Sequence, residues 1–168
     1  MRVETTLTTL LASAAILFIV TSSSAQDSAA ENAGSATGSE VTEPLNDIKL
    51  LAQQAALPSL KGENKFILRE SWWSGNIAPG KAKLIQVQLF RRNMYRFWLA
   101  VPNQKAELNL NIYDSEGSLV PAETKLLEGE HIVSITVKPE LTGVYYIRVS
   151  LKTTIDQPQD WAVIYAYR

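Results

Sequence analysis

Histidine and cysteine, which often carry acid–base and nucleophilic chemistry, are scarce in this chain. The sequence has a single histidine, His131, and no cysteine. The lack of cysteine excludes disulfides, zinc–cysteine sites, iron–sulfur clusters and thiol catalysis. His131 begins an apolar strand pattern on the same side as Val133 and Ile135, and a histidine at a strand end usually has a structural role. Because no Gly-x-Ser-x-Gly or similar motif supplies a nucleophile, we expect no enzymatic activity and no cofactor.

The oxygen atoms of Asp114 and Glu116 are candidates for calcium binding. Both residues lie in Asp114-Ser115-Glu116-Gly117, directly after an alternating apolar pattern. A calcium site needs about six to eight oxygen ligands, and this segment supplies few of them. Asp and Gly also have ordinary roles in turns. We therefore expect a turn here and no metal site.

Aromatic and cationic side chains on two strand patterns suggest ligand recognition instead. Arg96 and Trp98 share one side of their strand, and Tyr146 and Arg148 share one side of another. If both strands belong to one sheet and these faces are open, the four residues form a platform for a glycan or protein ligand. The alternative is that an N-terminal helix covers the face, or that the residues are scattered surface.

A series of short strands must position these residues. Strand patterns separated by turn residues occupy residues 65–73, 83–90, 94–101, 107–113, 131–137, 144–151 and 161–167. No apolar helical pattern lies between them, which argues against a parallel α/β sheet. The sequence predicts an all-β domain over residues 63–168, an antiparallel, jelly-roll-like β-sandwich. Gly143 precedes one of the strands, and we expect it to have a positive φ in the turn there.

Residues 1–25 are predicted to be a signal peptide. An apolar run over residues 10–20 ends before Ser23 and Ala25, which are small residues at the −3 and −1 positions of a cleavage site. The run is shorter than the roughly 20 apolar residues of a membrane-spanning helix. We expect export to the periplasm or the extracellular space, with a mature chain that begins at Gln26 and has no membrane span.

Two further segments precede the predicted sandwich. Residues 26–43 are rich in Ser, Ala, Gly, Thr and acidic residues, so we interpret them as a disordered linker or a tethering spacer. Residues 44–57 are predicted to form a short amphipathic helix. Apolar residues recur there at helical spacing, namely Leu45, Ile48, Leu51, Ala52 and Ala55. This helix packs on the sandwich, frays in solution, or docks onto a partner.

Sequence patterns in the second half of the chain resemble a known family. An alternating strand ends in Tyr113-Asp114-x-x-Gly117, and residues 143–149 read Gly-Val-Tyr-Tyr-Ile-Arg-Val. Together with Tyr95, Phe97 and the strand at 161–167, these residues resemble the bacterial pre-peptidase C-terminal domain over residues 81–168. The resemblance implies a secreted β-sandwich of the kind usually appended to extracellular peptidases, here as a standalone module without chemistry of its own.

Charge narrows the class of partner. Residues 63–168 contain 13 Lys or Arg and 11 Asp or Glu, so the domain lacks the positive field that nucleic-acid binding requires. The predicted function is that of a non-catalytic exported β-sandwich that binds a protein or polysaccharide at the cell envelope or outside it. The alternatives are an accessory module or inhibitor of a separate secreted peptidase, and an enzyme of unrecognised type.

Overall fold

The structure is a computed structural model that describes residues 43–103, 106–127, 129 and 131–168. The predicted signal peptide, and the predicted linker up to residue 42, lie outside the described residues. Within the described part of the chain, no helix has both the length and the apolar character needed to cross a membrane.

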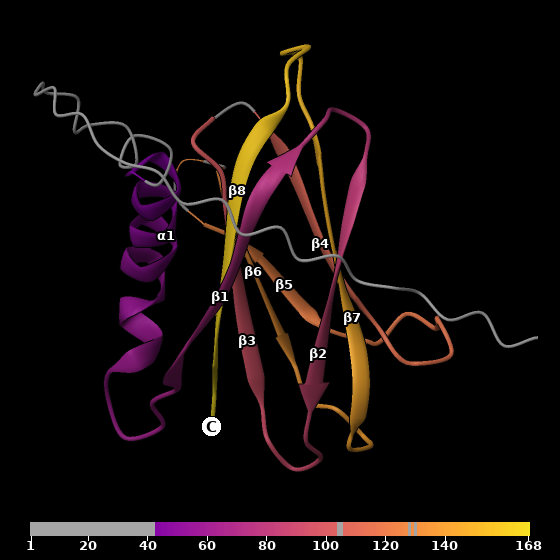
Figure 1. Ribbon diagram of the computed structural model, residues 1–168. Coiled ribbons are helices and arrows are strands. Elements are labelled where there is room, and N and C mark those ends of the chain that lie inside the picture. The colour runs from indigo at the N-terminus through magenta and orange to yellow at the C-terminus, as the bar shows by residue number, and fades with distance from the viewer. Residues whose placement is uncertain (1–42, 104–105, 128, 130) are drawn as a thin grey trace, which may run out of the picture. The chain divides into compact units, whose positions relative to one another are not determined.

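Eight described strands form two antiparallel sheets, which confirms the predicted β-sandwich (Figure 1). The larger sheet has the order β1 (Ile67–Ile77), β8 (Gln159–Tyr167), β3 (Tyr95–Ala100), β6 (Ile132–Val137) and β5 (Glu123–Leu126). The smaller sheet has the order β2 (Ala82–Leu89), β7 (Gly143–Lys152) and β4 (Glu107–Tyr113). Strands β1 and β2 are therefore edge strands of different sheets.

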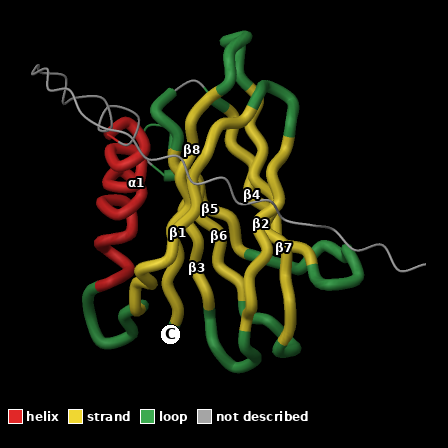
Figure 2. The backbone as a smooth tube through the Cα atoms, in the orientation of Figure 1, coloured by secondary structure: helices red, strands yellow, loops and turns green. Residues whose placement is uncertain are grey.

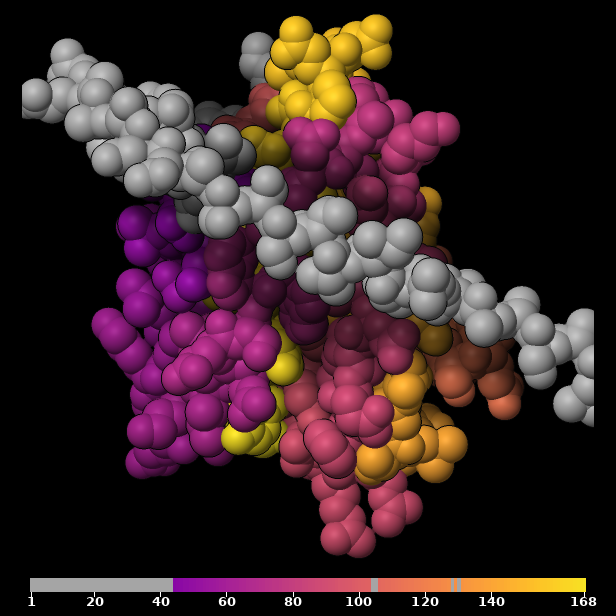
Figure 3. Space-filling model, in the orientation of Figure 1, coloured from indigo at the N-terminus to yellow at the C-terminus, as the bar shows by residue number. Residues whose placement is uncertain are grey.

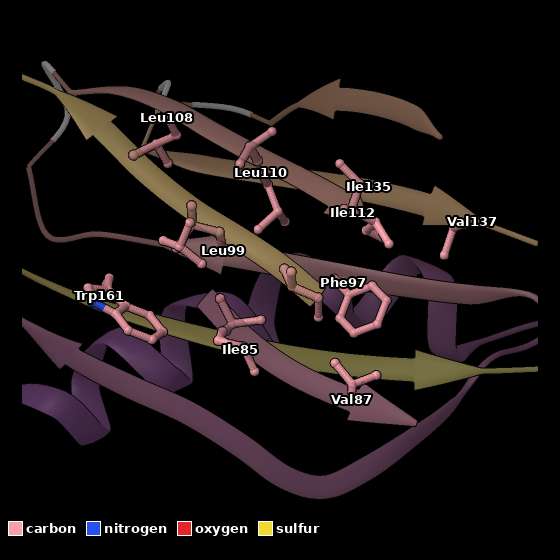
Figure 4. Packing of buried hydrophobic residues seen from close by; sticks show 14 of the residues in the cluster. Ile85, Val87, Phe97, Leu99, Leu108, Leu110, Ile112, Ile135, Val137 and Trp161 are labelled. Carbon is pink, nitrogen blue, oxygen red and sulfur yellow. The ribbon is translucent and has the colours of Figure 1, made fainter. Parts of the chain in front are cut away.

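The core between the sheets follows from side-chain alternation along each strand. Phe97 and Leu99 of β3 point inward and are fully buried, together with Ile112 of β4 and Ile147 of β7. Figure 4 shows this packing, with Ile85 on β2 directed into the same interior as Phe97 and Leu99. Residues between these positions face outward, as the period-two pattern predicts.

A second core lies on the outer face of the larger sheet, beneath helix α1 (Glu43–Ala56). The helix, red in Figure 2, runs alongside this sheet and continues into a 3-10 turn, η1 (Leu57–Leu60). Its buried residues Ile48, Ala52 and Ala56 pack in one cluster with Trp98 and Ile164. Of the possibilities weighed for the amphipathic helix, the structure shows packing on the sandwich.

Two differences from the predicted strands exceed a shift of one or two residues. β1 continues through the expected turn at residues 74–76 to Ile77, and Gly75 lies in it opposite Trp161 of β8. A Cβ atom at Gly75 would lie 3.5 Å from the Trp161 ring, which is ordinary van der Waals contact, so the packing here leaves room for a small side chain. Strand β5 was not predicted, because all four of its residues are exposed and carry no alternating pattern.

One glycine prediction is confirmed and another is wrong. Gly117 has a φ of 82° in the turn after β4. The Asp114 carboxylate accepts hydrogen bonds there from the backbone N–H groups of Glu116 at 2.9 Å and Ser118 at 2.8 Å. Gly143, in contrast, is the first residue of β7 and is not among the glycines with positive φ. Its strand conformation places it in the ladder opposite Leu89 instead of in the preceding turn.

A groove between two free strand edges

The predicted platform does not form, because its four residues lie on different sheets. Arg96 and Trp98 belong to β3 of the larger sheet, whereas Tyr146 and Arg148 belong to β7 of the smaller one. Trp98 is only 1% exposed and is buried in the cluster beneath α1. The prediction of one shared ligand face is therefore wrong, and the covered-face alternative describes the β3 half.

Arg96 is engaged in holding the helical segment to the sheet. Its Nε donates a hydrogen bond to Thr136 Oγ1 at 2.7 Å, and a terminal nitrogen donates to Ser59 Oγ at 2.9 Å. The guanidinium also lies 5.0 Å from the centre of the Phe66 ring. These contacts link β3 to β6 and to η1, which indicates a structural role.

Tyr146 and Arg148 face outward on the smaller sheet and are half-buried. The Arg148 guanidinium donates a hydrogen bond to Ser150 Oγ at 2.8 Å. Tyr146 is paired with Gln86 on one side and Tyr113 on the other. Ligand binding by these two residues stays a prediction, now without their β3 partners.

A groove lies between β1 and β2. Its wider section has a volume of about 620 Å³ and its narrower section about 470 Å³. Trp73 and Gln86 line both sections, so the two are consecutive parts of one groove. Figure 2 shows β1 and β2 diverging from the turn that joins them.

The walls of the groove are strand edges. Residues 83–88 of β2 line it without interruption, and so do residues 72–74 of β1. Consecutive side chains of a strand point to opposite faces, so an unbroken series of lining residues means that the backbone edge itself forms the wall. A ligand in the groove would meet peptide N–H and C=O groups along its length.

The floor of the wider section is aromatic. Trp73 packs against Tyr165 with ring centroids 5.2 Å apart, and Tyr165 stacks on buried Phe97 at 5.4 Å. Tyr95 and Tyr167 complete the floor. These rings project inward from β1, β3 and β8, so the inter-sheet core extends into the groove and gives a ligand apolar surface to cover.

The turn between β2 and β3 closes the wider end of the groove. It stands out at the lower end of the domain in Figure 3. The Tyr95 hydroxyl accepts hydrogen bonds from the backbone N–H of Phe90 at 3.0 Å and from Asn93 Nδ2 at 3.2 Å. This pair of bonds fixes the turn, and Phe90 remains 52% exposed at the mouth.

The groove has positive charge and no described carboxylate. Arg69 lines the wider section and Lys83 the narrower one, and none of the described lining residues is Asp or Glu. A bulge in β1 between Leu68 and Trp72 directs Arg69 toward the aromatic floor, where its guanidinium lies 5.7 Å from the Tyr167 ring centre. Hydrogen bonding to Tyr165 raises the pKa of Arg69 above its ordinary value, so this charge is constant across physiological pH.

Trp161, beside the narrower section, has an unsatisfied hydrogen-bond donor. The residue lines this section and is 4% exposed. Its Nε1 is buried and has no acceptor among the described residues. A buried donor without a partner costs about 1–3 kcal/mol. The nitrogen is enclosed by the protein, so the residue offers the groove its ring surface and not its N–H group.

No described His, Cys, Asp and Glu side chains gather in a group of three that could hold a metal ion. His131 lies just before β6, where its Nδ1 is 2.8 Å from the carbonyl oxygen of Gly129. This contact stays within its own loop, as a structural role would require.

Sequence reasoning missed the groove because it arises from the pairing of strands. The order of the strands, which places β1 and β2 at neighbouring edges, carries no local signal. One clue was available in the adjacent tryptophans Trp72 and Trp73, since neighbours in a strand cannot share one core. The structure packs Trp72 against the helix cluster and Trp73 against the inter-sheet core, where it also lines the groove.

Comparisons with known proteins leave the chain without an assigned family. No family model matches it, and no curated protein matches it. Among solved structures, it is similar to the crystal structure of the Bacillus licheniformis lipase BlEst2 in its propeptide form, with 14% identity and a TM-score of 0.38. That match covers 70% of this chain and 27% of the lipase chain. A likeness of this degree supports no conclusion about function.

Proposed function

We propose that this protein is a non-catalytic exported β-sandwich that binds a protein or polysaccharide at the cell envelope or outside it, and that the groove between β1 and β2 holds the ligand. The observation that carries the proposal is the groove itself, with its aromatic floor and basic lining. Concave sites lined by aromatic rings and a few placed polar groups are typical of ligand-binding sites.

The sequence supports the same proposal independently. An export signal is predicted for residues 1–25. The residues that resemble the pre-peptidase C-terminal domain lie in β3, in β4 with its turn, in β7 and in β8. We propose a relation to that family on this basis, which fits a secreted module that acts by binding.

A binding screen with matched variants tests the proposal. The purified protein is measured by biolayer interferometry against a neutral polysaccharide, a uronic-acid polysaccharide, an amino-sugar polysaccharide and the disordered protein casein. We expect at least one probe to bind, and Trp73→Ala to weaken that binding by about tenfold or more. Arg69→Ala tests the same groove without risk to the fold, because this side chain is exposed.

Two further variants serve as references. Leu126→Ala removes an exposed apolar side chain from β5, and we expect unchanged binding. Tyr146→Ala tests the outer face of the smaller sheet, where the sequence predicted a ligand contact. Loss of binding in Tyr146→Ala with full binding in Trp73→Ala and Arg69→Ala would contradict the groove as the site, and no binding to any probe would contradict the function.

A further inference from the structure

We infer that the ligand of the groove is an extended polypeptide segment of a partner protein, which adds a strand to the free edge of β2. This inference rests on the proposed function and names its class of ligand. Its starting point is the backbone wall formed by residues 83–88. Addition of a strand to a sheet edge gives affinity through main-chain hydrogen bonds and specificity through pockets for alternate side chains.

Edge strands in natural proteins are usually protected against such pairing, and three of the four described edges here are short, bulged or partly covered. β5 is only four residues long. β1 is interrupted by the bulge between Leu68 and Trp72. The end of β4 is covered by its own chain, because Leu119 bridges to Tyr113 and the Val120 N–H donates to the Ile112 carbonyl at 2.8 Å.

β2 is the exception among these edges. It is eight residues long and pairs with β7 in unbroken register from Ala82 to Leu89. Within the described part of the chain, no backbone hydrogen bond outside that ladder involves residues 83–88. Every second residue of an antiparallel edge strand directs its N–H and C=O groups away from its partner, so β2 presents a regular series of free donors and acceptors to the groove.

The lining defines what the added strand would carry. The aromatic floor beside Trp73 and Tyr165 fits a large apolar side chain. Arg69 and Lys83, with no described carboxylate among the lining residues, favour an acidic side chain. The expected ligand is therefore an extended segment with apolar and acidic residues.

Panning of a peptide library tests the inference directly. Residues 83–90 span roughly 25 Å at about 3.3 Å per residue, so displayed random peptides of about twelve residues are long enough. The purified full chain is the bait, and the Arg69→Ala and Trp73→Ala proteins provide the counter-selection. We expect enriched peptides that combine large apolar with acidic residues and that bind neither variant.

Amide hydrogen exchange then locates a bound peptide. We expect alternate amides of β2 to exchange at least about tenfold more slowly in the complex than in the free protein. The exchange rates of the edge strands β4 and β5 in the same sample should be unchanged. Protection at β4 or β5 without β2 would overturn the inference. So would a dimer of this chain, detected by sedimentation, that Arg69→Ala dissolves, because the occupant would then be a second copy.

Failure of the inference is distinguishable from failure of the proposed function. If no peptide is enriched, but a polysaccharide binds the wild type and not the Arg69→Ala and Trp73→Ala variants, the inference of a peptide ligand is overturned. The groove would then remain the binding site. No enriched peptide and no groove-dependent probe would overturn both.

Discussion

Trp72 and Trp73 are neighbours in β1, yet they belong to two different regions of the molecule, a sheet face covered by a helix and an uncovered strand edge. Trp72 packs against the cluster under α1, with Lys49 Nζ lying 4.6 Å from its ring centre. Trp73 lines the groove, where its ring is supported on one side by Tyr165. One surface of the larger sheet is thus closed by the chain itself, and the edge beside it is left open.

Trp98 and Trp161 repeat the contrast deeper in the fold. Both are almost fully buried, but Trp98 lies in the cluster beneath the helix, whereas Trp161 lines the groove and its donor has no acceptor among the described residues. Residues beneath the helix should therefore govern stability, and residues of the groove should govern binding. Substitutions on the two sides separate these effects.

The largest effect is expected for Trp98→Ala. Truncation of a buried tryptophan to alanine costs about 3–5 kcal/mol of unfolding free energy, and Trp98 is 1% exposed. Urea denaturation measures the loss. A midpoint close to that of the wild type would show that the face beneath α1 is loosely packed. It would contradict the expectation that residues beneath the helix govern stability.

Ala52→Leu tests how closely the helix fits the sheet. Ala52 is fully buried against a surface that includes Ala162 and Ala166 of β8, so extra methyl groups should cost about 1–3 kcal/mol. Gln54→Leu on the exposed side of the same helix is the matched control and should change stability by about 0.5 kcal/mol or less. Equal denaturation midpoints for the two variants would contradict the packing of α1.

Trp161→Phe should affect binding more than stability. The smaller ring loses some packing, but the change also removes a buried donor that has no described partner, so we expect a net loss below about 1.5 kcal/mol. Binding of the probe that the groove recognises should weaken. A large drop in the urea midpoint with unchanged affinity would assign Trp161 to the core alone.

The smallest effect is expected for Gly143→Val. The sequence predicted a positive φ here, but Gly143 lies in β7 and a Cβ atom there would have no neighbour within 4 Å. The substitution should change stability by about 0.5 kcal/mol or less. Gly117→Val is the contrast, because φ is 82° there, and it should cost about 1–3 kcal/mol by thermal denaturation.

The sandwich could be predicted because alternation is a local property. Leu108, Leu110 and Ile112 show the inward face of β4 in the sequence itself, and the helical spacing of Ile48 and Ala52 shows the buried face of α1. The sheet to which each strand belongs depends on pairings between distant residues, such as Trp98 with Ile164. Strand parity therefore placed Trp98 correctly beside Arg96, but it could not show that Tyr146 lies on the other sheet.

The four tryptophans, Trp72, Trp73, Trp98 and Trp161, provide the most direct test of the groove as the ligand site. Each indole N–H gives its own signal in a proton–nitrogen correlation spectrum, so one titration with the probe or enriched peptide that binds reports on both regions. We predict that the Trp73 and Trp161 signals shift, and that the Trp98 signal, buried beneath α1, does not. Shifts confined to Trp98, or no shift at Trp73 and Trp161 at saturation, would contradict the account.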